Sequence, residues 1–304
     1  MNIINFTEPH AAQAMRLAQA AYDAERALVP ALSDMQVPDL RHLAKNNRGV
    51  AAFEGDTMLG FLGAQGPFKR AFGSTPVKGV WSPVHANAAI GDKARVYHRM
   101  YQAAAEKWVN AGALAHCLTL YAHDEEAKQA WFTYGFGMRC IDAVKLIEPG
   151  EPEGDFLELP RERFGEAQAL RRALCRYEGE SPYFLKRRFS PDNEKDARVF
   201  VARQAGRFAA YLKLRNDGET FASQATNMMH ICGVYAVPEA RGTGLYANLL
   251  RYVEGVLAGE GYTRLGVDYE SFNPNALYFY PKHFTVYTNS LVRRIDERGN
   301  QRLF

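Results

Sequence analysis

The stretch from Val234 to Leu250 constrains the fold of this chain more than any other. A short apolar run ends at Pro238, the tetrapeptide Arg241-Gly-Thr-Gly244 follows, and apolar residues then recur at helical spacing. This order predicts a strand, a tight turn and the start of a helix. The first N–H groups of a helix have no intrahelical partner, so a helix that begins at such a turn favours an anion there. Arg241 adds a fixed positive charge at the same place.

This stretch resembles the acetyl-CoA-binding motif of the GNAT superfamily of N-acyltransferases, Arg/Gln-x-x-Gly-x-Gly/Ala. Arg241 and Gly244 match the motif, and Tyr246 stands at its last position, where a tyrosine leaves less room beside the pyrophosphate. The resemblance implies that acetyl-CoA binds at the turn and along the strand before it. The cofactor-binding residues expected on this basis are Tyr235, Val237, Arg241, Gly242, Thr243, Gly244, Leu245, Tyr246 and Asn273.

A second motif occupies residues 273–284, directly after the apolar run that ends at Glu270. It resembles the Asn-x-x-Ala-x-x-x-Tyr helix of GNAT enzymes, with Asn273, Ala276 and Tyr280 in the matching places. The resemblance implies that Tyr280 protonates the departing coenzyme A thiolate or hydrogen-bonds the thioester sulfur, and that Asn273 contacts the pantetheine arm. The alternative is that Tyr280 is only a core aromatic residue. His283 departs from the glycine that many relatives have at its place.

An amine nucleophile arrives protonated and needs a base, acting directly or through water. The candidates are His230, Asp268 and Glu270, and strand alternation puts the two carboxylates on one side of their strand. A backbone N–H of the strand 233–237 would meet the oxyanion of the tetrahedral intermediate. Gly233 permits a bulge that frees such a donor.

The order helix, hairpin, strand, helix, strand, helix, strand occurs twice along the chain. Four aromatic or small positions in the first copy recur 149 residues later: Tyr97 and Tyr246, Gly112 and Gly261, Ala127 and Ala276, Trp131 and Tyr280. The repeat predicts an α/β (α+β) protein of two tandem GNAT-like domains, 1–150 and 151–304, each a twisted mixed β-sheet flanked by helices. The turn-rich segment 149–154 is the expected linker.

The first copy lacks the glycine turn, because His85 to Lys93 contains no Arg-Gly-x-Gly and places Asp92 near the helix start. We therefore expect domain 1–150 to be degenerate and without cofactor. Pro83 and Pro238 are 155 residues apart, which predicts a loop six residues longer in the first copy.

With 304 residues and 47% hydrophobic content, the chain can fill two cores. Its formal net charge of +3 does not call for nucleic acid or an anionic membrane. No segment reaches the ~20 apolar residues of a membrane helix, and the N-terminus has no signal-peptide pattern. Four scattered cysteines show no zinc-ligand spacing, so we expect no metal. Because the sequence shows no signal-peptide or membrane-helix pattern, we expect a cytoplasmic location.

The resulting hypothesis is an N-acetyltransferase that transfers an acetyl group from acetyl-CoA to an amine of a small molecule by direct attack. The segment 178–189, which includes Tyr183, Phe184 and the basic run 186–188, is the expected substrate wall and hints at an acidic or polar acceptor; the equal alternative is a covering loop. Two alternatives stay open: a catalytically silent acyl-CoA-binding regulatory module, and a protein-interaction scaffold. The sequence does not indicate the oligomeric state, although tandem domains can act as a pseudo-dimer.

Overall fold

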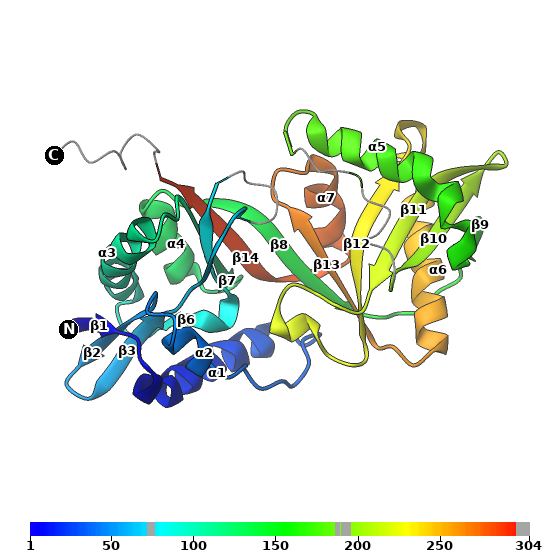
Figure 1. Cartoon of the computed structure of the whole chain (residues 1–304). Coiled ribbons are helices and arrows are strands. Elements are labelled where there is room, and N and C mark those ends of the chain that lie inside the picture. The colour runs from blue at the N-terminus through cyan, green and yellow to red at the C-terminus, as the bar shows by residue number, and fades with distance from the viewer. Residues whose placement is uncertain (72–76, 186–188, 190–195, 296–304) are drawn as a thin grey trace. The chain divides into compact units, whose positions relative to one another are not determined.

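The structure is a computed structural model that describes residues 1–71, 77–185, 189 and 196–295 (Figure 1). The chain divides into two compact units. The first comprises Met1–Ile141 and Val286–Phe304, and the second comprises Asp142–Thr285. Each unit is described here by itself, beginning with the elements along the chain.

The two halves of the chain share an order of elements, except that α2, β4 and β6 occur in the first half alone. The first half contains β1 (Asn2–Asn5), α1 (Ala11–Leu28), α2 (Arg41–Ala44), β2 (Val50–Glu54), β3 (Thr57–Leu62), β4 (Gln65–Phe68), β5 (Gly79–Ser82), β6 (Asn87–Ala89), α3 (Lys93–Asn110), β7 (Ala115–Tyr121), α4 (Glu125–Thr133) and β8 (Gly137–Leu146). The second half contains β9 (Asp155–Leu159), α5 (Gln168–Gly179), β10 (Arg198–Gln204), β11 (Arg207–Arg215), β12 (Met228–Ala236), α6 (Leu245–Gly259), β13 (Arg264–Glu270), α7 (Pro274–Phe279) and β14 (Thr285–Arg294). The sequence pattern missed β1, β4, β6 and β9, because segments of three to five residues are too short to establish a period.

In the second unit, β9 to β13 lie side by side in the order β9-β10-β11-β12-β13. Neighbouring strands are antiparallel except β12 and β13, which are parallel. Helices cover both faces: Val199 and Val201 pack in one core cluster with Leu170 of α5, whereas Phe200 contacts Tyr252 of α6 (Figure 1). Alternate residues of β10 thus bury against opposite helices, which fixes the register of the sheet.

The first unit contains a sheet in the order β1-β2-β3-β6 and a run of strands in the order β4-β5-β7-β14. Its core packs α3 and α4 around the fully buried Trp108 and Trp131. β14 pairs antiparallel with β7, from Thr288 opposite Tyr121 to Arg294 opposite Ala115. This pairing places the C-terminal strand in the first unit. The boundaries between the two compact units therefore lie at 141/142 and 285/286, whereas the sequence repeat places its boundary at 150/151.

The structure corrects the expectation of a longer loop in the first copy. Gly79 pairs with Ala115 in the parallel β5–β7 ladder, and Met228 pairs with Arg264 in the parallel β12–β13 ladder, so both partners recur at the offset of 149. The helices α3 and α6 keep the same offset through Tyr97 and Tyr246, which leaves no room for an insertion. Pro83 is therefore not the counterpart of Pro238. It instead follows the end of β5, where a 3-10 turn separates β5 from β6.

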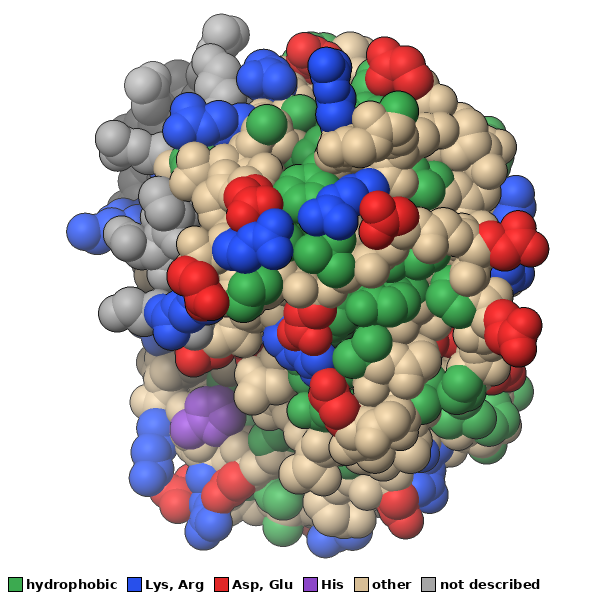
Figure 2. All heavy atoms as spheres, turned by 90° about the vertical axis from the view of Figure 1, so that its right-hand side faces the viewer, with side chains coloured by type: hydrophobic (Ala, Val, Ile, Leu, Met, Phe, Trp, Pro, Cys, Tyr) green, Lys and Arg blue, Asp and Glu red, His purple; other side chains and the backbone are tan. Residues whose placement is uncertain are grey.

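The described surface carries charges of both signs. On the face shown in Figure 2, Lys and Arg side chains lie among Asp and Glu side chains. Ion pairs of the second unit include Arg163 with Glu166 and Arg198 with both Glu158 and Glu260. Among the helices that the structure describes, none has both the length and the apolar character needed to cross a bilayer.

Acid is expected to destabilise the first unit through His116, a fully buried residue of β7. Burial lowers the pKa of His116 from 6.5 to about 4. A depressed pKa means that the neutral imidazole stabilises the fold above pH 6.5 and that this contribution is lost as the pH falls to about 4. The full loss is on the order of 3 kcal/mol.

Urea denaturation at several pH values between 7 and 4 measures this slope. His116→Gln should flatten it, and His42→Gln is the matched control, because the His42 side chain is exposed to water. An equal pH slope in wild type and His116→Gln would contradict the assignment.

Candidate functional site

The second unit opens where β12 and β13 stop pairing. Their parallel ladder ends at Ile231 opposite Val267, although β12 continues to Ala236 and β13 to Glu270. At the same level β12 contains a bulge on its other edge: Lys213 faces Gly233 and Leu214 faces Ile231, so Cys232 is an extra residue. The bulge that Gly233 suggested in the sequence is confirmed. It bends the strand and leaves backbone groups outside the ladder.

The hydrogen bonding of β12 shows which backbone groups face the opening. The Val237 N–H donates to the Ala209 carbonyl at 2.8 Å, so residue 237 directs its backbone to β11. In an antiparallel ladder this direction alternates, and Val234 and Ala236 therefore point away from β11. The Ala236 carbonyl accepts from Nε of Arg241 at 3.1 Å on that side. The free edge of β12 belongs to Val234 and Ala236 rather than to Tyr235 and Val237.

The predicted turn joins β12 to α6 with two glycines in left-handed conformation, Gly242 at φ 76° and Gly244 at φ 85°. Such φ values favour glycine, which explains the Gly-x-Gly spacing. No side chain caps the start of α6. Thr243 supports the turn from within, because its hydroxyl donates to the Ala240 carbonyl at 2.8 Å and accepts from the Leu245 N–H at 3.4 Å. The helix start thus keeps N–H groups directed out of the turn.

Arg241 lies between two aromatic rings. Its guanidinium carbon is 5.1 Å from the ring centroid of Tyr177 in α5 and 5.3 Å from that of Tyr235 in β12. These cation–π contacts and the bond to Ala236 hold an exposed cation in place beside the turn.

A cavity of about 390 Å³ runs from this turn to α7. It is lined by six of the predicted cofactor residues: Tyr235, Arg241, Gly242, Gly244, Tyr246 and Asn273. Val237, Thr243 and Leu245 do not line it; they shape the strand end and the turn. We refer to this cavity as the groove.

Tyr280 forms the inner end of the groove. It is 6% exposed, its ring stacks on Tyr269 with centroids 5.1 Å apart, and its hydroxyl is 3.1 Å from that of Tyr246. Burial raises the pKa of Tyr280 well above 10, and burial likewise raises the pKa of Tyr246. Both phenols therefore stay protonated and can donate hydrogen bonds. The ring of Tyr246 packs on Phe279, so the unexpected tyrosine of the first motif forms part of the wall between α6 and α7.

Asn273 is the N-cap of α7. Its side-chain oxygen accepts from the N–H groups of Asn275 at 3.1 Å and Ala276 at 3.3 Å, and the Tyr177 hydroxyl donates to the same oxygen at 3.3 Å. Asn275 in turn donates to the Tyr177 hydroxyl at 2.8 Å. The Asn273 side chain therefore starts the helix and ties it to α5, while it also lines the groove.

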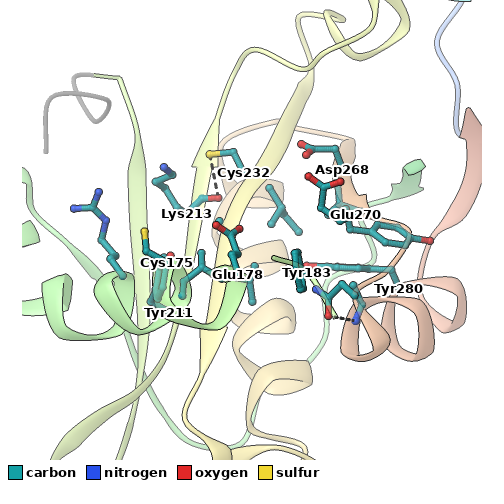
Figure 3. A pocket seen from close by; sticks show the side chains of 18 of the residues that line it. Cys175, Glu178, Tyr183, Tyr211, Lys213, Cys232, Asp268, Glu270 and Tyr280 are labelled. Atoms are coloured by element: carbon teal, nitrogen blue, oxygen red, sulfur yellow. Dashed lines mark hydrogen bonds between the residues drawn. The ribbon is translucent and has the colours of Figure 1, made fainter. Parts of the chain in front are cut away.

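A second cavity of about 220 Å³ lies between α5, β11, β12 and β13 (Figure 3). It shares Leu174, Val234, Asn273, Ala276 and Tyr280 with the groove, so the two cavities meet at these residues. We call it the acceptor cavity. Its other lining residues include Arg171, Cys175, Glu178, Tyr183, Tyr211, Lys213, Cys232, Gly233, Asp268, Tyr269 and Glu270.

The structure separates the three candidate bases. Asp268 and Glu270 both line the acceptor cavity, on the same side of β13, as the alternation predicted (Figure 3). His230 does not line it: the ring is 2% exposed, and its Nε2 lies 3.0 Å from the Asp268 carboxylate. His230 is thus placed to position Asp268 from behind.

Sequence reasoning overlooked Tyr177, Arg171 and Lys213 as site residues, whereas Glu178, the first residue of the expected substrate wall, lines the acceptor cavity. A signal was present in α5, since Arg171 and Glu178 are two helical turns apart on the face that carries Leu174, and both side chains are buried. Charged side chains are seldom buried unless they are paired or serve a function, so their burial here marks the site. Of the expected substrate wall, Tyr183 lines the cavity and Phe184 is 70% exposed. The basic run 186–188 lies outside the described residues.

Within the described part of the chain, no three His, Cys, Asp or Glu side chains are grouped to hold a metal ion. Burial raises the pKa of Cys232 to about 11, so this thiol is protonated at neutral pH.

Comparison with known proteins agrees with this geometry. Residues 166–284 match the model of the acetyltransferase (GNAT) family. The match spans less than half of the chain, so it shows that the segment 166–284 is similar to GNAT acetyltransferases. The match covers the turn, the groove and all three candidate bases, and acyl transfer is the general chemistry that the family supports.

Solved structures with the same fold include a GCN5-related N-acetyltransferase from Sphaerobacter thermophilus, which is 12% identical, with a TM-score of 0.58 over 96% of this chain and 95% of that chain. A conserved protein from Staphylococcus epidermidis is 9% identical (TM-score 0.49, 78% and 91% covered), and a GNAT-family acetyltransferase from Colwellia psychrerythraea is 12% identical (0.48, 97% and 100%). The Sphaerobacter structure confirms the α/β fold class predicted for the GNAT domain. No curated protein is significantly similar in sequence.

The cap role of Asn273 can be tested by substitution. Asn273→Ala removes the acceptor for two helix-start N–H groups and should lower the free energy of unfolding by about 1 kcal/mol, whereas Asn273→Asp keeps a good cap and should be nearly neutral. Chemical denaturation of both variants measures the difference. Equal stability of Asn273→Ala and wild type would show that the cap contributes nothing to the fold.

Proposed function

We propose that the protein is an acetyl-CoA-dependent N-acetyltransferase that acetylates a primary amine of a small molecule. The observation that carries this proposal is the meeting of two cavities at Val234 and Tyr280. One is a groove that ends at an uncapped helix start with an arginine beside it, and the other is a small cavity lined by carboxylates. The junction is the place where a thioester and an amine would meet.

The groove suits coenzyme A in its chemistry. The helix-start N–H groups after Gly244, together with Arg241, would hold the pyrophosphate. The free backbone edge at Val234 and Ala236 would bind the amide groups of the pantetheine arm, as a further strand pairs with a sheet edge. Bound in this way, acetyl-CoA supplies an activated acetyl group.

The carboxylates of the acceptor cavity would bind the incoming ammonium group and remove its proton. Glu270 is 9% exposed and Asp268 is held by His230, so both are fixed in direction. Two acids beside one amine stabilise its cation on arrival, and either can accept the proton as the nitrogen forms its bond to the acetyl carbon. The Val234 N–H, on the free edge of β12, would donate to the acetyl oxygen.

Tyr280 would donate a hydrogen bond to the sulfur of the departing thiolate. As the carbon–sulfur bond breaks, the electron pair stays on sulfur and needs a hydrogen-bond donor or a proton. The Tyr280 phenol is protonated at every ordinary pH because burial raises its pKa, and Tyr246 lies within hydrogen-bond distance behind it. A phenol with so high a pKa stabilises a thiolate chiefly by donating a hydrogen bond.

We further propose one coenzyme A site per chain. In the first unit, the corresponding helix α3 has its start occupied by acids: the Asp92 carboxylate accepts from the Arg95 N–H at 3.0 Å, and Glu126 accepts from the Lys93 N–H at 2.9 Å. These carboxylates take up the N–H groups and repel a phosphate. A silent acyl-CoA-binding module remains the second candidate, because Tyr246 narrows the motif.

Binding of acetyl-CoA should depend on Arg241. Arg241→Gln removes a charge-assisted contact and should raise the dissociation constant of acetyl-CoA about tenfold or more, as measured by calorimetric titration. Arg251→Gln is the matched control, because Arg251 is an exposed arginine of α6, the helix after the turn, and does not line the groove. A stoichiometry of two, or equal affinity in the folded Arg241→Gln protein, would contradict the assigned site.

Turnover should depend on the Tyr280 hydroxyl. Tyr280→Phe keeps the ring and the groove but removes the donor, and we expect kcat to fall about 10²-fold with little change in acetyl-CoA affinity. Release of the free thiol with an accepted amine measures the rate. Tyr278→Phe, on the exposed side of α7, is the control. Full turnover in Tyr280→Phe would remove this residue from the mechanism, whereas binding without turnover of any amine would favour the silent module.

A further inference from the structure

The acceptor cavity is lined by charges of both signs, and they lie on different elements. Asp268 and Glu270 come from β13, next to Tyr280 and the groove, whereas Lys213 comes from β11 (Figure 3). In the figure Cys232 lies between the Lys213 side chain and the two carboxylates. The cavity therefore has the Asp268 and Glu270 carboxylates at one side and the Lys213 ammonium at the other, and the buried Glu178 of α5 also belongs to its lining.

Lys213 is held over the cavity by the local sheet geometry. It pairs with Gly233, and a Cβ added at Gly233 would lie 3.5 Å from Cε of Lys213 and 3.4 Å from the Tyr211 hydroxyl. The missing side chain of Gly233 thus leaves the space that the lysine stem and the tyrosine border. The Lys213 side chain is half-buried, and no described residue forms an ion pair or hydrogen bond with its ammonium. A ligand anion would provide the partner that this cation lacks.

Glu178 of α5 offsets a second positive charge in the cavity lining, that of Arg171. The Arg171 side chain is 8% exposed, and its guanidinium carbon is 4.8 Å from the Phe189 ring centroid. The charges of Arg171 and Glu178 both reach Tyr211 and shift the pKa of that phenol in opposite directions. Lys213 is therefore the cation on which recognition of a ligand anion depends.

From this arrangement we infer that the acceptor is a short amino acid or a similar amine that carries an anionic group at its other end. The inference rests on the proposed function. The amine lies at Asp268 and Glu270 and faces the thioester, and the carboxylate or phosphate lies at Lys213. A simple alkylamine leaves the Lys213 ammonium without a partner, and a diamine places a second cation against it, so both bind less well.

The test compares three ligand series at each chain length from two to six carbons: ω-amino acids, n-alkylamines and α,ω-diamines. Binding is measured by calorimetry on the full chain with coenzyme A present, and turnover by thiol release from acetyl-CoA. At the best length, the amino acid should bind at least about tenfold more tightly than the matched alkylamine, since the charge-assisted contact is lost in the latter. Equal or tighter binding of the alkylamines or diamines overturns the inference.

Lys213 provides the decisive variants. Lys213→Gln should remove the preference for the amino acid over the alkylamine, and Lys213→Glu should turn it into a preference for the diamine, with acetyl-CoA affinity unchanged in both. Arg215→Gln is the control on the same strand, because Arg215 pairs with Asp217 and does not line the cavity. Retention of the amino-acid preference in both folded Lys213 variants overturns the assignment.

The two proposals fail in different ways. If acetyl-CoA does not bind, the N-acetyltransferase proposal fails, whatever the amines do. If acetyl-CoA binds and no amino acid of the series binds, the acceptor class is wrong and the cofactor site stands. Binding of the amino acids without thiol release contradicts catalysis but supports the charge arrangement of the cavity.

Discussion

The site depends on one interruption of a β-ladder. Parallel strands β12 and β13 bond to each other up to Ile231 and Val267 and then part, at the level where the bulge at Cys232 bends β12. Unpaired strand edges inside a sheet are costly unless a partner satisfies them. Here Val234 on the free edge lines both cavities and Ala236 lines the groove, so a substrate rather than a strand can fill the gap. The groove, the acceptor cavity and the position of Tyr280 all follow from this separation.

The first unit has a parallel ladder in the same register, but its helix start differs from that of the second unit. The ladder β5–β7 keeps the register of β12–β13, but the first unit ends β5 at Ser82 and continues through a 3-10 turn at Pro83. Its helix start is then bound by Asp92 and Glu126 instead of being left open. Buried helix ends need partners, and side chains supply them here. A fold can thus retain its packing while the groups that would bind an anion are satisfied internally.

The sequence was informative where a residue type is required by backbone geometry. Gly242 and Gly244 occupy left-handed conformations, Gly233 flanks the bulge, and the alternation of β13 puts Asp268 and Glu270 together. The sequence was less informative where function depends on tertiary placement. His230 is a candidate base like the two acids, yet it is buried behind Asp268 and does not line the cavity. Lys213 looks like an ordinary strand lysine until its neighbours across the sheet are known.

Tyr246 illustrates how a departure from a motif can be absorbed by its surroundings. A small residue at this position of the family motif leaves space at the helix start, whereas the tyrosine ring here turns onto Phe279 and its hydroxyl reaches Tyr280. The added bulk therefore lies along the wall that α6 and α7 share, and it places a second protonated phenol beside the first. Because each phenol is buried, neither ionises readily, and the pair can hold a hydrogen bond in one direction or the other. If the Tyr280 hydroxyl donates to the sulfur, the Tyr246 hydroxyl can donate to Tyr280 in turn. The tyrosine at position 246 thus adds a hydrogen-bond partner to the proposed acid and does more than narrow the groove.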